Sequence, residues 1–403
     1  MIEADRAASD ARGWAANLAL FRVIFVAGVA LPAALHSLEW TRDGGGGLPL
    51  HWLALADVAL LALALLGAFT RSSLAGAAAL SLALTMLPLG DGLPSPFPRA
   101  VAWLLAVLAA GPCAHYLSVD AARAAVRRAV LGPVEAPAPD WSGLVMLRYA
   151  WGLLGLLHVS AGLSGVETAT LLSGRPRPDA ALLLASLAVS VYDLAFLPLV
   201  FLRAARPALL VGAAAIYVGQ GFAPGHWLDV GWGGFLVTHA CLVDWSAAAR
   251  ALRRRRAPIV VLYDGGCGLC RRVIGILRSV DLFDGVEPVP GLSGDPRRRR
   301  HPEITDEMLA HDLWVADGTR ARSGFLAYRL IAARVPVLWP LLPLMALPPV
   351  ARLGERLYRQ IADSRACLLI PSPSPLPAEP PPPAPHWIHA VGVLGLAGQG
   401  WLG

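Results

Sequence analysis

Two cysteines three positions apart are the side chains in this sequence best suited to chemistry. They stand in the run VVLYDGGCGLCRR, residues 260–272, where an apolar, β-rich stretch stops at a turn just before Cys267 and Cys270. The pattern predicts a strand, a turn and then a helix that begins at the first cysteine. The unpaired N–H groups and the positive dipole end of a helix N-terminus stabilise a thiolate. Arg271 and Arg272 add positive charge, so we predict a reactive dithiol.

A Cys-x-x-Cys pair can also be a zinc half-site, a structural disulfide or a chance occurrence. A zinc site needs two more ligands, and His301, His311 and Cys367 show no paired spacing. A static disulfide facing the cytosol would be reduced. We therefore predict no metal here and assign redox chemistry to the pair. Asp264 either shuttles a proton to the buried thiol or caps the helix that follows.

The composition indicates that most of the chain lies in lipid. Of its 403 residues, 56% are hydrophobic and only 15% are charged, and the mean hydropathy is +0.56. Apolar runs near the length of a membrane-spanning helix fall at residues 15–36, 50–69, 73–89, 100–117, 143–162, 180–201, 206–222 and 231–249. The sequence therefore predicts an α-helical polytopic membrane bundle of about eight spans.

Arginine placement predicts the orientation of this bundle. Arginines near span ends concentrate in segments on one side, among them Arg71, Arg123 and the block Arg253–Arg256. We expect an inner (cytoplasmic) membrane protein with both ends in the cytoplasm. The formal charge of +6 does not point to nucleic acid, because the arginines flank apolar spans. The chain contains no lysine, which excludes amine nucleophiles and Schiff bases.

After the arginine block the pattern changes to that of a small α/β domain. Short β-like runs and helical patterns alternate from Ile259 to about Ile370, with a hairpin at 313–323 and a helix at 324–334. Val335–Val350 is apolar but carries five prolines, which predicts a hydrophobic surface or membrane-contacting segment rather than a span. The expected domains are thus 1–252, 257–370, and a proline-rich linker with an apolar tail at 371–403.

The second domain resembles the DCC family of thiol–disulfide oxidoreductases. The Asp-x-x-Cys-x-x-Cys run stands as residues 264–270, and further landmarks are Val315-Ala316-Asp317-Gly318 with Ser323-Gly324, and Leu357-Tyr358 to Ser364-Arg365. Together they cover about 259–366. The resemblance implies a thioredoxin-like fold and a cysteine redox pair, with Cys267 as the attacking thiolate and Cys270 as the resolving thiol. One departure is from ordinary thioredoxins, which place a cis-proline directly before the corresponding strand; no proline stands directly before Leu313 here.

The membrane part resembles the HTTM module, which is related to the membrane part of vitamin K-dependent γ-carboxylases. The residues concerned are 18–22, Ala161-Gly162-Leu163 and Ser173-Gly174. Carboxylases continue this segment into lysines that act in catalysis, whereas this chain has Ser164-Gly165 there. Carboxylase activity is therefore not expected.

Ionisable residues within apolar spans need a partner or a function, because each costs several kcal/mol to insert. We expect Arg22 to face the bundle and to pair with Asp193 or Asp244. Asp57 and His158 are the deepest of a group of polar residues in the outer half of the bundle; the others are His36, Glu39, His51, Glu167 and His226. They either lie at the interface or line a cavity for a small molecule or a quinone-like lipid. The candidate ligand-binding residues are Arg22, Asp57, His158 and Asp193.

These observations favour an integral membrane protein with thiol–disulfide oxidoreductase activity, with the bilayer and an unidentified thiol or disulfide as partners. No cofactor is indicated other than the quinone-like lipid. The alternative is a membrane binding or transport module whose appended domain senses redox state without turnover. Cys113 and Cys241, near the inner ends of two predicted spans, could relay electrons to Cys267 or serve only as small apolar residues.

Overall fold

A computed structural model describes residues 2–42, 47–86, 96–131, 142–173, 180–221, 236–245, 247, 251, 257–291, 298–318 and 320–364. The chain divides into two compact units. The helical unit comprises the described residues of the ranges 1–114 and 139–244. The sheet unit comprises the described residues of the ranges 115–138 and 245–364.

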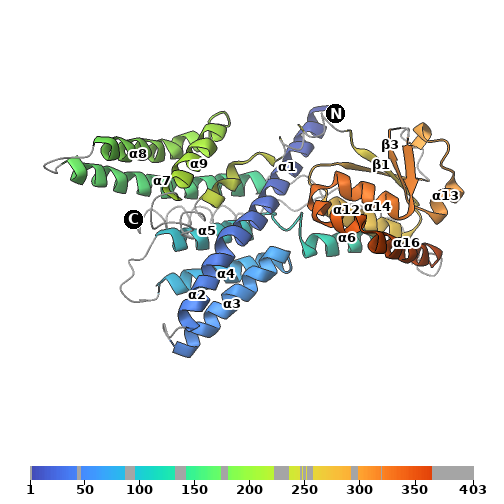
Figure 1. The fold of residues 1–403 in the computed structure, drawn as a ribbon, viewed down its shortest axis with the longest axis horizontal. Helices are drawn as coiled ribbons and strands as arrows, with labels where there is room; N and C mark the ends of the chain where they lie inside the picture. The colour runs from blue at the N-terminus through green and yellow to red at the C-terminus, as the bar shows by residue number, and fades with distance from the viewer. Residues whose placement is uncertain are drawn as a thin grey trace. The chain divides into compact units, whose positions relative to one another are not determined.

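The helical unit consists of apolar helices (Figure 1). In chain order they are α1 (Ile2–Phe25), the π-helical turn η1 (Val26–Ala30), α2 (Leu31–Arg42), α3 (Gly47–Leu66), α4 (Thr70–Met86), α5 (Pro96–Ala110), α7 (Ser142–Ser173), α8 (Ala180–Val200), α9 (Arg206–Gly221) and the 3₁₀ turn η2 (His239–Leu242). Their buried side chains, from Leu18 to Leu242, form one continuous core.

Among the described residues, four helices are long and apolar enough to cross a bilayer. They are Gly13–Arg42, Leu48–Leu66, Ser142–Glu167 and Leu183–Val200. The prediction of about eight spans is not confirmed, because Arg99–Ala110 and Arg206–Tyr217 fall short of spanning length and α4 has only 17 residues. The last predicted span, 231–249, lies largely outside the described residues. Several apolar helices nevertheless indicate a membrane protein.

Glycines bring α7 and α8 into close contact. A Cβ atom added at Gly155 would lie 3.1 Å from the Leu197 Cα, and one at Gly162 would lie 3.1 Å from the Asp193 Cβ. Small residues on one helix face let two backbones approach closely. His158 lies three positions after Gly155 and four before Gly162, so it shares this face and is directed at α8.

The sheet unit contains a mixed sheet with helices on both faces (Figure 1). Its elements are α6 (Val119–Leu131), β1 (Ile259–Tyr263), α12 (Gly268–Val280), β2 (Val286–Pro290), η3 (Arg298–Arg300), α13 (Asp306–His311), β3 (Trp314–Asp317), β4 (Arg320–Ser323), α14 (Gly324–Arg334), η4 (Pro336–Leu341), α15 (Leu342–Ala346) and α16 (Pro348–Asp363). The described strands run in the order β2-β1-β3-β4. β1 pairs with β2 in parallel and with β3 antiparallel.

The hairpin and helix predicted at 313–334 are confirmed. β3 and β4 pair antiparallel, and Gly318 turns the chain with φ +64°, a conformation that favours glycine. The side chains of β1 point alternately to the two faces of the sheet, and both faces are covered. Ile259, Val261 and Tyr263 join a core with α12 and α14, whereas Leu262 joins a second cluster with Ile304 and Leu309.

Helix α6 belongs to the sheet unit, although its sequence stands between two helices of the helical unit. The sequence had predicted this segment as part of the membrane domain. Ala121 and Ala125 are buried, and Gly275 of α12 accepts the close approach, since a Cβ there would lie 3.2 Å from the Ala125 Cβ. The Leu117 N–H donates to the Ser279 carbonyl at 3.1 Å. A small-residue face thus docks α6 along the helix that carries the dithiol.

Candidate functional site

The two cysteines lie where β1 passes into α12, as the sequence predicts. Cys267 is the N-cap residue of α12, with extended backbone angles, and its Sγ accepts the Cys270 N–H at 3.4 Å. The Cys267 carbonyl accepts the Arg271 N–H at 3.1 Å. The sulfur of Cys267 therefore takes the place that a Ser or Asp oxygen takes at an ordinary N-cap. This position directs backbone N–H dipoles at the sulfur, which favours a thiolate.

Both thiols are buried. Cys267 is 3% exposed and Cys270 is 4% exposed. They belong to the apolar core cluster that includes Val261, Tyr263 and Ile274. The neighbouring Gly266 is exposed, so the dithiol lies just beneath the surface of the unit. A substrate disulfide can reach Cys267 only if the covering residues move.

Tyr263, the last residue of β1, shares this environment. Burial raises the pKa of its phenol, and the guanidinium groups of Arg278 and Arg271 oppose that shift. These arginines are thus close enough to β1 to supply positive potential around the dithiol. The sequence prediction that Arg271 contributes positive charge here is consistent with this placement.

Asp264 holds the turn rather than the helix. Its Oδ1 accepts the Gly266 N–H at 2.8 Å, and its carbonyl accepts the Cys267 N–H at 3.2 Å. The prediction that Asp264 caps α12 is wrong in this detail, because Cys267 fills that position. An aspartate that bonds the backbone N–H two residues ahead forms an Asx turn, which delivers Cys267 to the helix start.

Comparison with known families supports this geometry. Residues 261–369 match the family model of the DCC1-like thiol-disulfide oxidoreductases. This part of the chain is a DCC1-like domain. The match includes the turn, both cysteines, the hairpin and α16. No curated protein and no solved structure matches the chain, and the resemblance of the membrane part to HTTM modules stays a prediction.

The C-terminal landmarks of the DCC domain have a structural role. The buried Tyr358 of α16 donates its hydroxyl to Asp312 Oδ1 at 2.8 Å and accepts the Leu313 N–H at 3.1 Å. Glu355 Oε2 accepts the Phe325 N–H at the start of α14, at 3.3 Å. These contacts fix α16 to the beginnings of β3 and α14, so this motif holds the fold rather than the reacting atoms.

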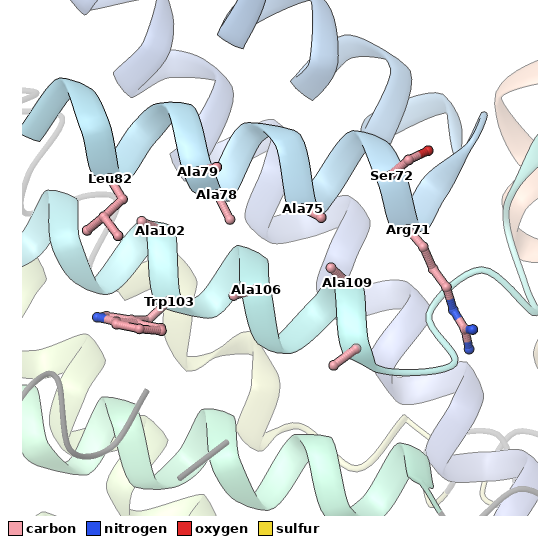
Figure 2. A pocket seen from close by; sticks show the side chains of 11 residues that line it. Arg71, Ser72, Ala75, Ala78, Ala79, Leu82, Ala102, Trp103, Ala106 and Ala109 are labelled. Atoms are coloured by element: carbon pink, nitrogen blue, oxygen red, sulfur yellow. The ribbon is translucent and has the colours of Figure 1, made fainter. Parts of the chain in front are cut away.

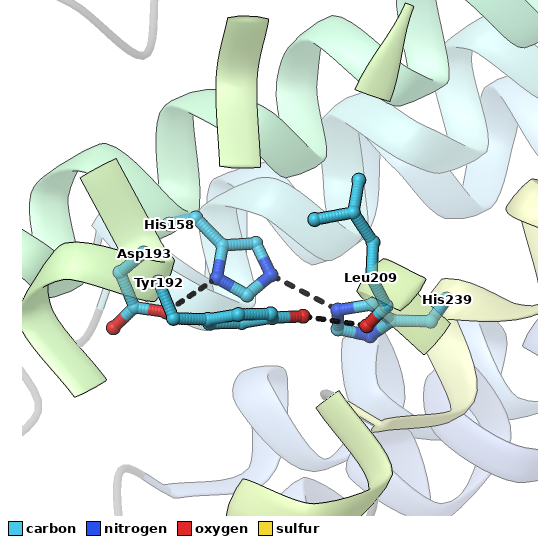
Figure 3. Close-up of polar contacts among 5 residues, drawn as sticks. All are labelled: His158, Tyr192, Asp193, Leu209 and His239. Carbon is cyan, nitrogen blue, oxygen red and sulfur yellow. Dashed lines mark hydrogen bonds and ion pairs between the residues drawn. The ribbon is translucent and has the colours of Figure 1, made fainter. Parts of the chain in front are cut away.

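A second cluster of reactive side chains lies inside the helical unit. His158 Nδ1 of α7 lies 2.7 Å from Asp193 Oδ1 of α8, and its Nε2 lies 2.9 Å from His239 Nε2 (Figure 3). All three residues are almost fully buried. The His158 ring stacks on Phe196 with centroids 3.8 Å apart. Beside the cluster, the Tyr192 hydroxyl donates to the Leu209 carbonyl at 2.7 Å.

The geometry of this cluster allows two arrangements of its protons. With Asp193 accepting from His158 Nδ1–H, a neutral His158 presents a bare Nε2, and His239 must then donate. A second proton on His158 reverses that bond, because both of its nitrogens then donate. His239 is not among the residues predicted from the sequence, where its only signal is an imidazole in the apolar stretch 236–243.

The structure brings together two of the four predicted ligand-binding residues, His158 and Asp193. Arg22 instead donates to the Cys113 carbonyl at 3.0 Å, and Asp57 Oδ2 accepts the Ser81 hydroxyl at 3.1 Å. The expected pairing of Arg22 with Asp193 or Asp244 is not what these contacts show. Asp193 bonds His158, and Asp244 forms an ion pair with Arg203 at 2.7 Å.

The membrane cysteines are also buried. The Cys113 thiol donates to the Leu108 carbonyl at 3.0 Å, and the Cys241 carbonyl accepts the Trp151 indole N–H at 2.9 Å. Both side chains belong to the helical core. Cys367 and His226 lie outside the described residues. Within the described ranges, no group of three or more His, Cys, Asp or Glu side chains could hold a metal ion.

An apolar groove of about 540 Å³ runs between α4 and α5 (Figure 2). Alanines line most of it, Leu82 and Trp103 lie at one end, and Arg71 lies at the other. Its volume is within the range of small-molecule sites. None of the four predicted ligand-binding residues lines this groove.

Proposed function

We propose that this chain is a membrane-anchored thiol–disulfide oxidoreductase that acts through Cys267 and Cys270. The observation that carries the proposal is the Cys267 sulfur at the N-cap of α12, bonded to the Cys270 N–H, within a DCC1-like domain. The strand order β2-β1-β3-β4, with β1 and β2 parallel and the following hairpin antiparallel, supports a thioredoxin-like fold.

The proposed reaction has two exchange steps. The Cys267 thiolate attacks a substrate disulfide, its S–S bond breaks, and one substrate thiolate leaves while the other sulfur stays bound to Cys267. Cys270 loses its proton and attacks this mixed disulfide, which releases the second substrate thiol and leaves a Cys267–Cys270 disulfide. Two electrons pass to the substrate, and the reverse sequence oxidises a dithiol.

Burial of the dithiol implies that access limits the rate. At 3% exposure, Cys267 needs a local opening before a substrate sulfur can approach it in line. The segment Asp264–Gly266 is the natural site of this opening, because it carries two glycines and is the most exposed part of the surroundings. We expect small disulfides to react faster than folded protein disulfides.

The arginine distribution supports an inner-membrane location with the DCC domain on the cytoplasmic side. A dithiol in that compartment starts its cycle reduced. Coupling to a small molecule or a quinone-like lipid would take place in the helical unit. The apolar groove between α4 and α5 and the buried hydrogen-bonded cluster around His158 support it.

The test is single-turnover exchange by the reduced full-length protein in nanodiscs, with glutathione disulfide as the probe and mass spectrometry as the readout. Wild-type protein should release two equivalents of glutathione per chain. Cys267→Ser should lower exchange to the uncatalysed background, and Cys270→Ser should stop at a glutathione adduct on Cys267. Cys113→Ser is the matched control and should exchange like wild type. Equal exchange by wild type and Cys267→Ser would refute the proposal.

A redox sensor without turnover is the second candidate, and the burial of both thiols favours it. In that case Cys267 and Cys270 would oxidise slowly and once, and oxidation would change ligand binding in the membrane part. Repeated turnover with glutathione disulfide and a dithiol reductant separates the two functions. An enzyme completes many cycles, whereas a sensor stops after the first.

A further inference from the structure

The C-terminal part of the DCC domain exposes an unusual amount of apolar side-chain surface. Eight large residues between 337 and 361 are each 38–55% exposed: Val337, Trp339, Leu341, Leu344, Leu347, Leu353, Leu357 and Ile361. We refer to these eight as the apolar surface. Soluble domains rarely leave a contiguous patch of this kind in water, and such patches mark protein or membrane contacts.

The apolar surface is built on a folded part of the domain. Its two helical pieces, 336–346 and 348–363, meet at an angle of 107°. Tyr358 and Glu355 hold the second piece against β3 and α14 through hydrogen bonds. A segment bent in this way and bonded to the sheet unit is not a straight transmembrane helix, so its exposed apolar groups need another apolar environment.

Helix α16 separates three kinds of residue around its axis. Gly354 and Tyr358 face the domain, and the Tyr358 side chain is buried. Leu353, Leu357 and Ile361 recur every four positions and form an exposed apolar stripe. The exposed Arg352, Arg356 and Arg359 lie off that stripe by helical spacing, and Arg359 also pairs with Glu355 at 3.1 Å. An amphipathic helix with arginines on its polar face is typical of helices that lie in the plane of a membrane interface.

We propose that the apolar surface lies in the interfacial layer of the bilayer that this chain spans, with anionic phospholipid headgroups against the arginines of α16. The chain itself supplies a nearby bilayer. Helix α6 belongs to the sheet unit, as the apolar surface does, and Ser142, the first residue of a candidate span, follows the end of α6 by only eleven positions. Charge complementarity favours anionic lipid, since an arginine near such a surface contributes about 1 kcal/mol.

Two local features fit this environment. Trp339 is 48% exposed, and its indole N–H already donates to the Ala333 carbonyl at 3.1 Å, so the ring can enter lipid without leaving a donor unpaired. Tryptophan is enriched at this depth in membrane proteins. Leu338, beside it, packs against the core cluster that contains Cys267 and Cys270. Membrane contact at the apolar surface would therefore hold the dithiol domain near the bilayer.

The test is the lipid exposure of α16 in full-length protein, reconstituted in vesicles of phosphatidylcholine mixed with phosphatidylglycerol. Spin labels are placed by Leu357→Cys or by the matched control Arg359→Cys, in a chain whose native cysteines are serine. The ratio of oxygen to nickel-chelate accessibility should be several-fold higher at 357 than at 359. Arg356→Gln should lower the inserted fraction at 357 by about fivefold. Equal ratios at 357 and 359, or exclusion of both reagents from 357, would overturn the proposal.

A second measurement uses the native chain, in case the cysteine-free protein does not fold. Phospholipids with a photoactivatable acyl chain are cross-linked to the protein in the same vesicles, and labelled peptides are identified by mass spectrometry. Peptides from 336–363 should be labelled together with those from the candidate span Leu48–Leu66, the positive control. Label on the span but none on 336–363 would show that protein, rather than lipid, covers the apolar surface.

Discussion

The dithiol site and the cluster of His158, Asp193 and His239 are assembled in opposite ways. At the dithiol, the polar contacts join residues two to four positions apart, from Asp264 to Arg271. In the helical unit, His158 meets Asp193 across 35 positions and His239 across 81. The first cluster depends on one turn and one helix start, and the second depends on how several helices pack.

Because of this difference, we expect the two clusters to be sensitive to different substitutions. A local cluster survives changes in distant packing as long as its turn and helix form. A cluster assembled from three segments loses its geometry when any one of them shifts, and its burial makes a lost partner costly. Substitutions that remove only local contacts, or only long-range contacts, therefore test whether the two clusters differ in this way.

The largest effect is expected from His158→Ala. The change removes the imidazole that bonds the buried Asp193 carboxylate at 2.7 Å. A buried charged acceptor left without its donor, together with the cavity in place of the ring, costs about 3 kcal/mol or more. The conservative partner variant Asp193→Asn keeps an oxygen that can accept from His158 and should cost about 1 kcal/mol. Thermal unfolding of full-length protein in nanodiscs compares them.

These variants also test whether the two clusters are coupled. Glutathione disulfide exchange by Cys267 should be unchanged in Asp193→Asn, if the dithiol depends only on local contacts. A large change in exchange rate with intact folding would show that the cluster around His158 acts on the thiol chemistry. Equal stability of His158→Ala and Asp193→Asn would contradict the assignment of a strong pair between His158 and Asp193.

A smaller effect is expected at Gly275 of α12, where helix α6, distant in the sequence, packs against the helix that carries the dithiol. A Cβ there would lie 3.2 Å from the Ala125 Cβ and 3.3 Å from the Ala125 carbonyl oxygen, so Gly275→Leu should push α6 away from α12 at a cost of about 1–3 kcal/mol. Hydrogen exchange should rise in peptides from α6 and stay unchanged in those from α7. Adding Ala125→Gly should restore part of the protection; unchanged α6 exchange in Gly275→Leu would show that this contact does not hold α6.

The contrast between local and long-range assembly also explains how much could be predicted from the sequence. The dithiol site was predictable because its parts are contiguous, and the strand, the turn and Cys267 at the helix start fix one another within a few residues. The hairpin at 313–323 and the helix after it were predictable for the same reason, since Asp317-Gly318 sets the turn. Of the two roles predicted for Asp264, the helix cap is wrong, because either Asp264 or Cys267 could fill the N-cap by spacing alone and Cys267 fills it.

Features that depend on contacts between distant residues were harder to predict from the sequence. The predicted span count came from apolar run lengths, which do not show where a helix ends; α5, for example, ends at Ala110, whereas the apolar run continues to residue 117. Docking of α6 depends on Ala125 fitting against Gly275, about 150 positions away, which no local pattern reveals. His239 was missed because its partner His158 lies 81 positions away, on a helix whose packing had first to be known.

The smallest effect is expected at Asp264, and it decides between a turn residue and a proton carrier. Asp264→Asn keeps an oxygen that accepts the Gly266 N–H, whereas Asp264→Ala loses this bond, which is worth about 1 kcal/mol. If Asp264 only holds the turn, Asn should exchange like wild type, and Ala should make Cys267 alkylate a few-fold faster by loosening its cover. A proton carrier would instead make Asn as slow as Ala, with a loss of about 10² or more in exchange rate. A turn residue predicts that Asn differs from Ala, and a proton carrier predicts that the two variants are equally slow. Alkylation and exchange rates measured on this pair of variants therefore distinguish the two roles.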